Sequence, residues 1–164
     1  MSVYIGVDPG FTGYLVAISG AGEIVSTLKM PRCGRSGPVD IAVVMEWLID
    51  VKDGRAVVML EGLVKPGGKM KGSKGTYQTQ GANWGALRGM LIALGARFDT
   101  PPPRRWQQAI CPGKGDTKAR SIAACRRLFP DLDLTPGRKT KPDDNLADAA
   151  CLAEYARRMF GGGS

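Results

Sequence analysis

The stretch "VYIGVDPGFTGYLVAI", residues 3–18, contains the first two strands that the sequence predicts. Apolar runs at residues 2–7 and 13–18 flank a Gly-rich turn, and a third run follows at residues 24–29. This pattern predicts that the chain opens as an antiparallel meander of three strands. Asp8 stands directly after the first strand, where a purely structural strand would need no carboxylate. It is therefore the first candidate for a functional side chain.

Length and composition favour one soluble globular domain. The chain has 164 residues, 43% of them apolar and 23% charged, and no apolar run approaches the ~20 residues needed to span a bilayer. We predict a single domain over residues 1–160 and a disordered Gly-rich tail at 161–164. The N-terminus does not look like a secretory signal. The expected location is the cytoplasm of a bacterial or phage-infected cell, or an organelle if a transit segment has been removed.

The absence of histidine restricts the possible chemistry. The sequence contains no histidine at all, which excludes Ser-His-Asp triads, Cys-His pairs and H-E-x-x-H zinc sites. The four cysteines are far apart and form no C-x-x-C pair, which argues against a zinc site and against a disulfide scaffold. Any catalysis must therefore use carboxylates, lysines or metal ions.

Positive charge is concentrated in the middle of the chain. The net charge is +8, yet residues 62–142 hold sixteen lysines or arginines and only four aspartates. The segments before and after are each slightly acidic. Segregation on this scale favours a nucleic-acid partner over a merely solubilising surface, because phosphate contacts release counterions.

The second half of the sheet is predicted from a strand, helix, strand pattern. A helix is expected over Val39–Val51 with Asp40 at its start, followed by the apolar strand "AVVML", residues 56–60. Such a crossover implies parallel pairing within an α/β fold. Residues 62–78 are rich in Gly and Lys and are predicted to form a loop. The remaining predictions are a helix at 80–95, a short strand at 96–99, a helix beginning in "PPPRRWQQAI", and helices at 117–129 and 143–160.

Three glycines in the predicted helix at 80–95 recur at successive turns. Gly81, Gly85 and Gly89 weaken a helix unless something must approach closely. The sheet and a second copy of the chain are the two candidates for that neighbour.

Four acids are expected to meet at one edge of the sheet. Asp8 follows strand "VYIGV" and Glu61 follows "AVVML", so parallel pairing would bring both carboxylates to the same carboxyl edge. Asp144 and Asp148 are four residues apart and share one helix face. If that helix packs beside the sheet edge, all four converge.

A divalent cation would stabilise such a cluster. Neighbouring carboxylates repel and favour protonation, whereas oxygen ligands without His or Cys suit Mg²⁺ or Mn²⁺. Two ions could activate a water and stabilise the leaving oxygen of a phosphodiester. Each acid alone also has a structural explanation: Asp8 as a turn former, Asp143 and Asp144 as helix caps, and Asp148 as a solvated side chain. Taken together, the four favour a nuclease site.

Several segments, taken in order, resemble one family. They are "GVDPGFTGYLVAI", "VVMLEG", "GALRGMLIALG", "PPRRWQQAI", "GDTKARSIAACRRLFP" and "KPDDNLADAACLAEY". This set resembles the RuvC-type Holliday-junction resolvases of the ribonuclease H-like superfamily, and most of all their short phage and organelle-type members. The resemblance covers nearly the whole chain. It implies a five-stranded mixed sheet flanked by helices, a homodimer, and Mg²⁺-dependent paired incision of four-way DNA junctions.

The resemblance also assigns roles to residues. It implies that Asp8, Glu61 and Asp148 are metal ligands, with a further acid one turn before Asp148. Many relatives carry that acid, or a histidine, three positions before the last aspartate, and this chain has Asn145 there. Asp144 is preferred over Asp143 as the fourth ligand. Lys118 lies in a segment that resembles the family's lysine-bearing segment near the scissile phosphate.

The basic middle of the chain is expected to contact DNA. The predicted loop after Glu61 would follow a branch point, with Tyr77 or Met70 as a possible wedge between bases. Trp106 is predicted to belong to the core. The predicted DNA contacts are Lys65, Lys69, Lys71, Lys74, Tyr77, Arg104, Arg105, Lys114, Lys118, Arg120, Lys139 and Lys141.

Three other functions share part of this pattern. Actin-like and sugar-kinase ATPases also begin with a "GVDxG" turn, but they need two lobes, for which 164 residues are too few. A less selective nuclease for flaps and other branched DNA would use the same site. A DNA-binding protein without catalysis would keep the fold and would not need the acids.

Overall fold

The computed structural model describes residues 2–51, 55–63, 74–137 and 140–162. A five-stranded sheet in the order β3-β2-β1-β4-β5 forms its centre, which confirms the predicted mixed α/β fold. The strands are β1 Val3–Val7, β2 Tyr14–Ser19, β3 Ile24–Lys29, β4 Ala56–Leu60 and β5 Arg97–Asp99. The helices are α1 Ile41–Val51, α2 Lys74–Ala93, α3 Pro103–Ile110, α4 Thr117–Leu128 and α5 Asp144–Phe160.

The strand pairing is antiparallel in the first half of the sheet and parallel in the second. β1 pairs with β2, and β2 with β3, in the predicted antiparallel meander. β4 pairs with β1 and with β5 in parallel, as the strand, helix, strand pattern predicted. β1 and β2 are buried along their whole length, because helices cover the sheet on both faces.

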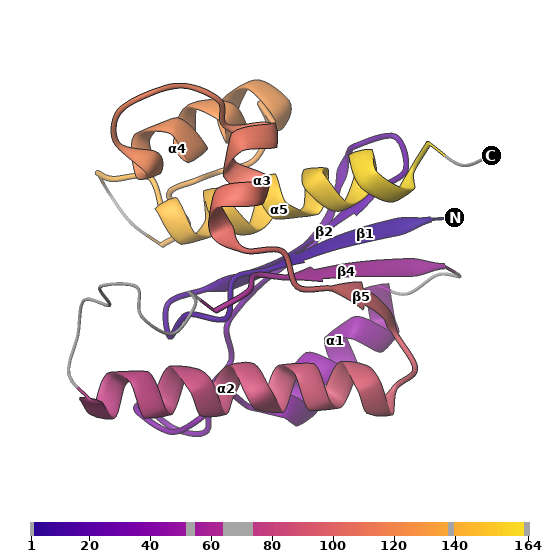
Figure 1. Ribbon diagram of the computed structural model, residues 1–164, viewed down its shortest axis with the longest axis vertical. Coiled ribbons are helices and arrows are strands. Elements are labelled where there is room, and N and C mark those ends of the chain that lie inside the picture. The colour runs from indigo at the N-terminus through magenta and orange to yellow at the C-terminus, as the bar shows by residue number, and fades with distance from the viewer. Residues whose placement is uncertain (1, 52–54, 64–73, 138–139, 163–164) are drawn as a thin grey trace.

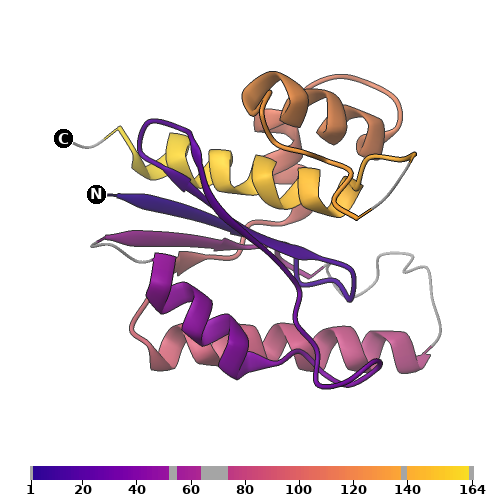
Figure 2. The ribbon, with the colours of Figure 1, turned by 180° about the vertical axis from the view of Figure 1, so that it is seen from behind.

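Two helical layers cover the sheet. Helices α1 and α2 lie on one face, and α3, α4 and α5 lie on the other (Figures 1 and 2). The alternation along β4 supplies both cores: Val57 and Met59 belong to the core under α5, whereas Val58 and Leu60 belong to the core over α1 and α2. No helix in the described ranges is long and apolar enough to cross a membrane.

Helix α5 packs unusually close to the central strand β1. A Cβ atom added to Gly6 would lie 2.1 Å from the backbone oxygen of Ala149 and 2.4 Å from the backbone nitrogen of Ala153. These positions are occupied by main chain, which cannot rotate away as a side chain would. The absence of a side chain at Gly6 therefore allows α5 to lie directly on the sheet.

Helix α2 differs from the prediction at its N-terminus. It begins at Lys74, so residues 74–78 are helical where the Gly and Lys-rich composition predicted a loop. Leu87 and Leu91 are buried against the sheet, and this packing supports a helix that extends N-terminally through residues of modest helix propensity. The Thr79 hydroxyl also donates to the Gly75 carbonyl oxygen, within the first turns. Tyr77 consequently lies on a helix.

The other helices begin where polar side chains can bond the free N–H groups. The Asp40 carboxylate accepts from Val43 N, Asp116 from Ala119 N, and Asp143 from Asn145 N. These contacts explain why α1, α4 and α5 begin within two residues of their predicted starts.

The close packing at Gly6 leads to a first prediction. Gly6→Ala should lower the free energy of unfolding by about 3 kcal/mol, because the new methyl group overlaps the α5 backbone. Urea unfolding followed by circular dichroism would measure this change.

Gly20→Ala is the matched control, since a Cβ there has only Ser2 O within 4 Å, at 3.8 Å. It should change stability by less than about 1 kcal/mol. Equal stabilities for the two variants would mean that α5 does not lie on β1 as described.

Candidate active site

Asp8 and Glu61 emerge side by side at the carboxyl edge of the sheet. The parallel register pairs Val7 with Leu60, the residues directly before the two acids. Glu61 N donates to Val7 O at 3.0 Å, which continues the ladder into the site. Both acids line a cavity of about 160 Å³. The rest of its lining is Pro9, Gly10, Gly62, Leu63, Gln80 and Pro103.

Asp148 and Asp144 reach the same edge from α5. The field of Asp144 raises the pKa of Asp8, and the field of Asp148 raises the pKa of Glu61. Asp8 and Asp144 in turn raise the pKa of Asp148. These mutual effects require proximity, so the four acids lie near one another at this edge of the sheet.

Burial is the main cause of the raised pKa values at this site. It raises the pKa of Asp8 to about 6, although the Gly10 N–H, which donates to Asp8 Oδ1 at 3.0 Å, lowers it. Burial and the neighbouring Asp8 raise the pKa of Glu61 to about 8. Burial likewise raises the pKa of Asp148 to about 7, against the lowering effect of the Ser121 hydroxyl. Such shifts are typical of functional sites, because folding gains nothing from desolvating a carboxylate.

The donor set fits a hard cation. All the groups are carboxylates, and Asp148 Oδ1 is buried without a hydrogen-bond partner. An unpartnered buried oxygen is costly, and a metal ion would satisfy it. As they stand, no three acidic or thiol side chains in the described part of the chain surround a single point closely enough to hold an ion. Ion binding would therefore require small movements of these side chains toward one another.

Asp143 and Asp144 have different surroundings. Asp143 is buried, and its carboxylate accepts from Asn145 N at 3.2 Å and from the Tyr14 hydroxyl at 3.3 Å. Asp144 lies in the first turn of α5 and pairs with Lys118, whose Nζ is 2.6 Å from its Oδ2. Asp143 thus serves as the helix cap, and Asp144 is the freer of the two to contact a cation.

Two tryptophans bond to Glu61. Trp106 Nε1 on α3 donates to the Glu61 carboxylate Oε1 at 3.0 Å, and Trp84 Nε1 on α2 donates to the Glu61 carbonyl oxygen at 2.9 Å. Trp106 belongs to the core, as predicted, and is completely buried. Its second role could not be predicted, because nothing in "PRRWQQ" identifies the partner of the indole N–H.

Two further polar contacts at the site were missed from the sequence. Ser121 lies on α4, and its hydroxyl lowers the pKa of Asp148. Asn145 Nδ2 donates to Thr12 Oγ1 at 2.9 Å, which links α5 to the turn after Asp8. The position of Asn145, three residues before Asp148, was the one available signal.

The predicted DNA contacts have different surroundings in the structure. Arg120 is largely engaged internally, since its Nη1 donates to Cys111 O at 3.1 Å and Gly113 O at 2.6 Å. Tyr77 has its hydroxyl buried, which does not suit a wedge between bases. Arg104, Arg105, Lys114, Lys118 and Lys141 are exposed. Lys65, Lys69, Lys71, Lys139 and the side chain of Lys74 lie outside the described residues, as does Met70.

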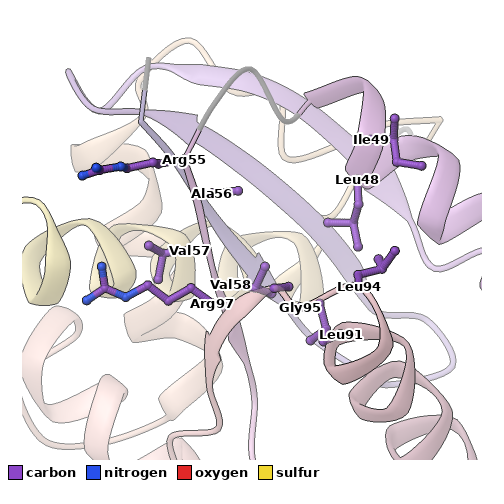
Figure 3. Close-up of a pocket in the computed structure, with 11 residues that line it drawn as sticks. Leu48, Ile49, Arg55, Ala56, Val57, Val58, Leu91, Leu94, Gly95 and Arg97 are labelled. Atoms are coloured by element: carbon purple, nitrogen blue, oxygen red, sulfur yellow. The ribbon is translucent and has the colours of Figure 1, made fainter.

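A second cavity, of about 420 Å³, lies at the opposite edge of the sheet (Figure 3). Leu48, Val58, Leu91 and Leu94 form its apolar side, and it opens beside the residues that begin β4 and β5. None of the four acids lines it. Arg55 and Arg97 add basic groups to its lining, so its chemistry differs from that of the acidic site.

Comparison with known proteins identifies the fold. No protein-family model matches the sequence, and no curated protein matches it. Among solved structures, the chain is similar to RuvC of T. thermophilus in complex with a Holliday junction substrate, with a TM-score of 0.62, 18% sequence identity and 96% of each chain covered. It is also similar to another Thermus thermophilus RuvC structure, with a TM-score of 0.60, 19% identity and 96% of each chain covered. The chain therefore has the ribonuclease H-like fold of RuvC, as its sequence predicted.

The raised pKa values predict that the metal-free protein loses stability as the pH rises. The folded state retains protons at Asp8, Asp148 and Glu61 up to about pH 6, 7 and 8, whereas their ordinary pKa values are 3.8, 3.8 and 4.5. With EDTA present, the free energy of unfolding should fall between about pH 4 and pH 8, by up to ~1.4 kcal/mol per pH unit for each group. Urea unfolding at a series of pH values would measure this slope.

Glu61→Gln should flatten the upper part of this slope and stabilise the metal-free protein at pH 8 by at least about 1 kcal/mol. The exposed Glu23→Gln is the matched control. An equally steep slope in Glu61→Gln would show that Glu61 does not carry the shift.

Proposed function

We propose that this protein is a metal-dependent endonuclease that resolves four-way DNA junctions by paired, symmetric incisions. The observation that carries the proposal is the gathering of Asp8, Glu61 and Asp148 at one edge of a RuvC fold, with Asp148 Oδ1 unpartnered. The RuvC structure that binds a Holliday junction substrate supports the choice of branched DNA. The short phage and organelle-type subfamily and a cytoplasmic location stay predictions.

The acids would hold divalent cations, Mg²⁺ or Mn²⁺, two per site. Ions bound there would supply a nucleophilic water and stabilise the leaving oxygen of the phosphodiester. Asp8, Glu61 and Asp148 would be ligands from three elements, with Asp144 as the fourth. The Gly10 N–H orients Asp8 through Oδ1, which leaves Oδ2 available to the site.

Lys118 would neutralise the phosphate that is cut. Its side chain is 67% exposed and is held at the site by Asp144. Since Asp144 raises the pKa of Lys118, the ammonium stays charged at neutral pH. A DNA strand at the acidic edge would place its phosphate near this ammonium.

Exposed basic side chains beside the site would bind the arms of the junction. Arg104 and Arg105 lie on α3 directly after Pro103, which lines the acidic cavity. Lys114 lies in the turn before α4. These residues and the predicted contacts in the basic segment outside the described residues would add a salt-dependent attraction for the DNA backbone.

A homodimer is proposed because a four-way junction needs two cuts related by symmetry. The outer face of α2 is the proposed interface. A Cβ atom added to Gly81, Gly85 or Gly89 would meet nothing within 4 Å, so these glycines do not face the sheet, and the first of the two explanations for them is wrong. Ile92, one turn beyond Gly89, is 53% exposed. A second copy of the chain would explain both the glycines and the exposed isoleucine.

A DNA-binding protein without catalysis is the weaker alternative. Three partly buried carboxylates with raised pKa values destabilise the metal-free fold, and such a protein would gain nothing from them. A less selective nuclease for flaps would use the same site, and the choice of DNA substrate distinguishes it from a resolvase.

Cleavage of labelled four-way junctions, flaps and plain duplexes tests the activity. With Mg²⁺ the protein should nick the junction at symmetric positions, and EDTA should abolish cutting. Asp8→Asn should lower the rate at least about 100-fold, because it removes a ligand charge at the centre of the site. Circular dichroism would verify that the variant is folded.

The exposed Glu23→Gln, outside the basic middle of the chain and outside the acidic site, serves as the activity control. Equal cutting of flaps and junctions would favour the less selective nuclease. Undiminished cutting by Asp8→Asn would contradict the proposed site.

The proposed dimer can be tested by light scattering coupled to gel filtration. Gly85→Leu should convert the dimer into a monomer, because a large side chain would separate two closely packed helices. The substitution also raises helix propensity, so the monomer should stay folded. A dimer that tolerates Gly85→Leu would place the interface elsewhere.

A further inference from the structure

Glu61 is held from both helical layers by tryptophan side chains. Trp84 on α2 donates from Nε1 to its carbonyl oxygen at 2.9 Å, and Trp106 on α3 donates from Nε1 to its carboxylate Oε1 at 3.0 Å. The third tryptophan, Trp47 on α1, donates from Nε1 to Ser26 Oγ on β3, at 2.9 Å. None of the four acids lies on either of these elements. Two of the three indole N–H groups therefore donate to Glu61.

Trp106 is well suited to fix a carboxylate. It is completely buried in the core under α5, so its ring cannot rotate without disturbing the packing. Its N–H consequently points in one direction. A glutamate side chain has several rotatable bonds, and a bond to a fixed donor selects one of its rotamers.

The core packing alone does not require this arrangement. A phenylalanine or leucine would fill the same core without a polar atom, whereas a buried indole N–H needs an acceptor. A backbone carbonyl could accept that bond at no electrostatic cost. Here the acceptor is the Glu61 carboxylate, whose charged form burial destabilises. The hydrogen bond from the neutral indole favours that charged form and so lowers the pKa of Glu61. The indole therefore supports Glu61 in the state that a cation needs.

We propose that Trp106 is a positioning residue for metal binding: it occupies Oε1 of Glu61 and leaves Oε2 as the atom that contacts the cation. Trp84 anchors the main chain of the same residue. This inference rests on the proposed metal-dependent function. It adds that one layer of the fold orients the carboxylate and the other fixes the backbone from which it extends.

Indole N–H resonances provide a direct readout. In protein with ¹⁵N-labelled tryptophan, Trp47→Phe, Trp84→Phe and Trp106→Phe assign the three signals by removal. Mn²⁺ is paramagnetic and broadens signals near its binding site. The Trp106 signal of the wild-type protein should broaden first, and the Trp47 signal should persist. This measurement is made on the unaltered site, so it holds even if a variant at position 106 is unstable.

Metal affinity and kinetics test the positioning role itself. Trp106→Phe should weaken Mn²⁺ binding measured by calorimetry roughly 10-fold to 100-fold, as is typical when a bond to a metal ligand is lost. The kcat of junction cleavage should fall with the KM for DNA unchanged, because DNA binding does not involve the buried indole. Trp47→Phe removes an equivalent hydrogen bond outside the site and should change neither quantity.

The outcomes separate this inference from the proposed function. Mn²⁺ affinity and kcat unchanged in a folded Trp106→Phe, with normal cleavage by the wild type, would overturn the positioning role and leave the nuclease intact. Mn²⁺ binding that depends on Trp106, without cleavage of any DNA, would support the positioning role and overturn the nuclease. Broadening of Trp47 before Trp106 would also overturn the inference, because the cation would then lie elsewhere.

Discussion

The direct packing of α5 on β1 at Gly6 is the constraint on which the candidate site depends. The two backbones lie too close for any side chain between them. This proximity brings Asp148, on α5, to the edge where Asp8 ends β1 and Glu61 ends β4. With the helix farther from the sheet, Asp144 would raise the pKa of Asp8 less, and Asp148 would raise the pKa of Glu61 less.

The acids lower the stability of the metal-free fold. Burial and mutual repulsion raise the pKa values of Asp8, Glu61 and Asp148, so the folded state favours their protonated forms. The rest of the fold must supply the stability that this cluster removes. A cation between the carboxylates would relieve the repulsion, and binding and stability would then be coupled.

The two helical layers have different tasks in the proposed mechanism. The layer of α3, α4 and α5 carries Asp144, Asp148, Lys118 and the exposed arginines of α3, and it would contact DNA and metal ions. The layer of α1 and α2 exposes a face with glycines and Ile92 that suits a second chain. Glu61 lies between the layers and is bonded to both through Trp84 and Trp106.

Sequence patterns alone predicted the strands, the parallel pairing of β1 with β4, and hence the meeting of Asp8 and Glu61. Apolar alternation identifies strands locally, and a strand, helix, strand order favours parallel pairing. The sequence also predicted the helix of Asp144 and Asp148. Only the tertiary structure distinguished Asp143, as a helix cap, from Asp144. It alone extended α2 back to Lys74 and revealed the bond of Trp106 to Glu61. These features depend on which groups meet across layers, and side-chain partners distant in the chain leave no periodic signal in the sequence.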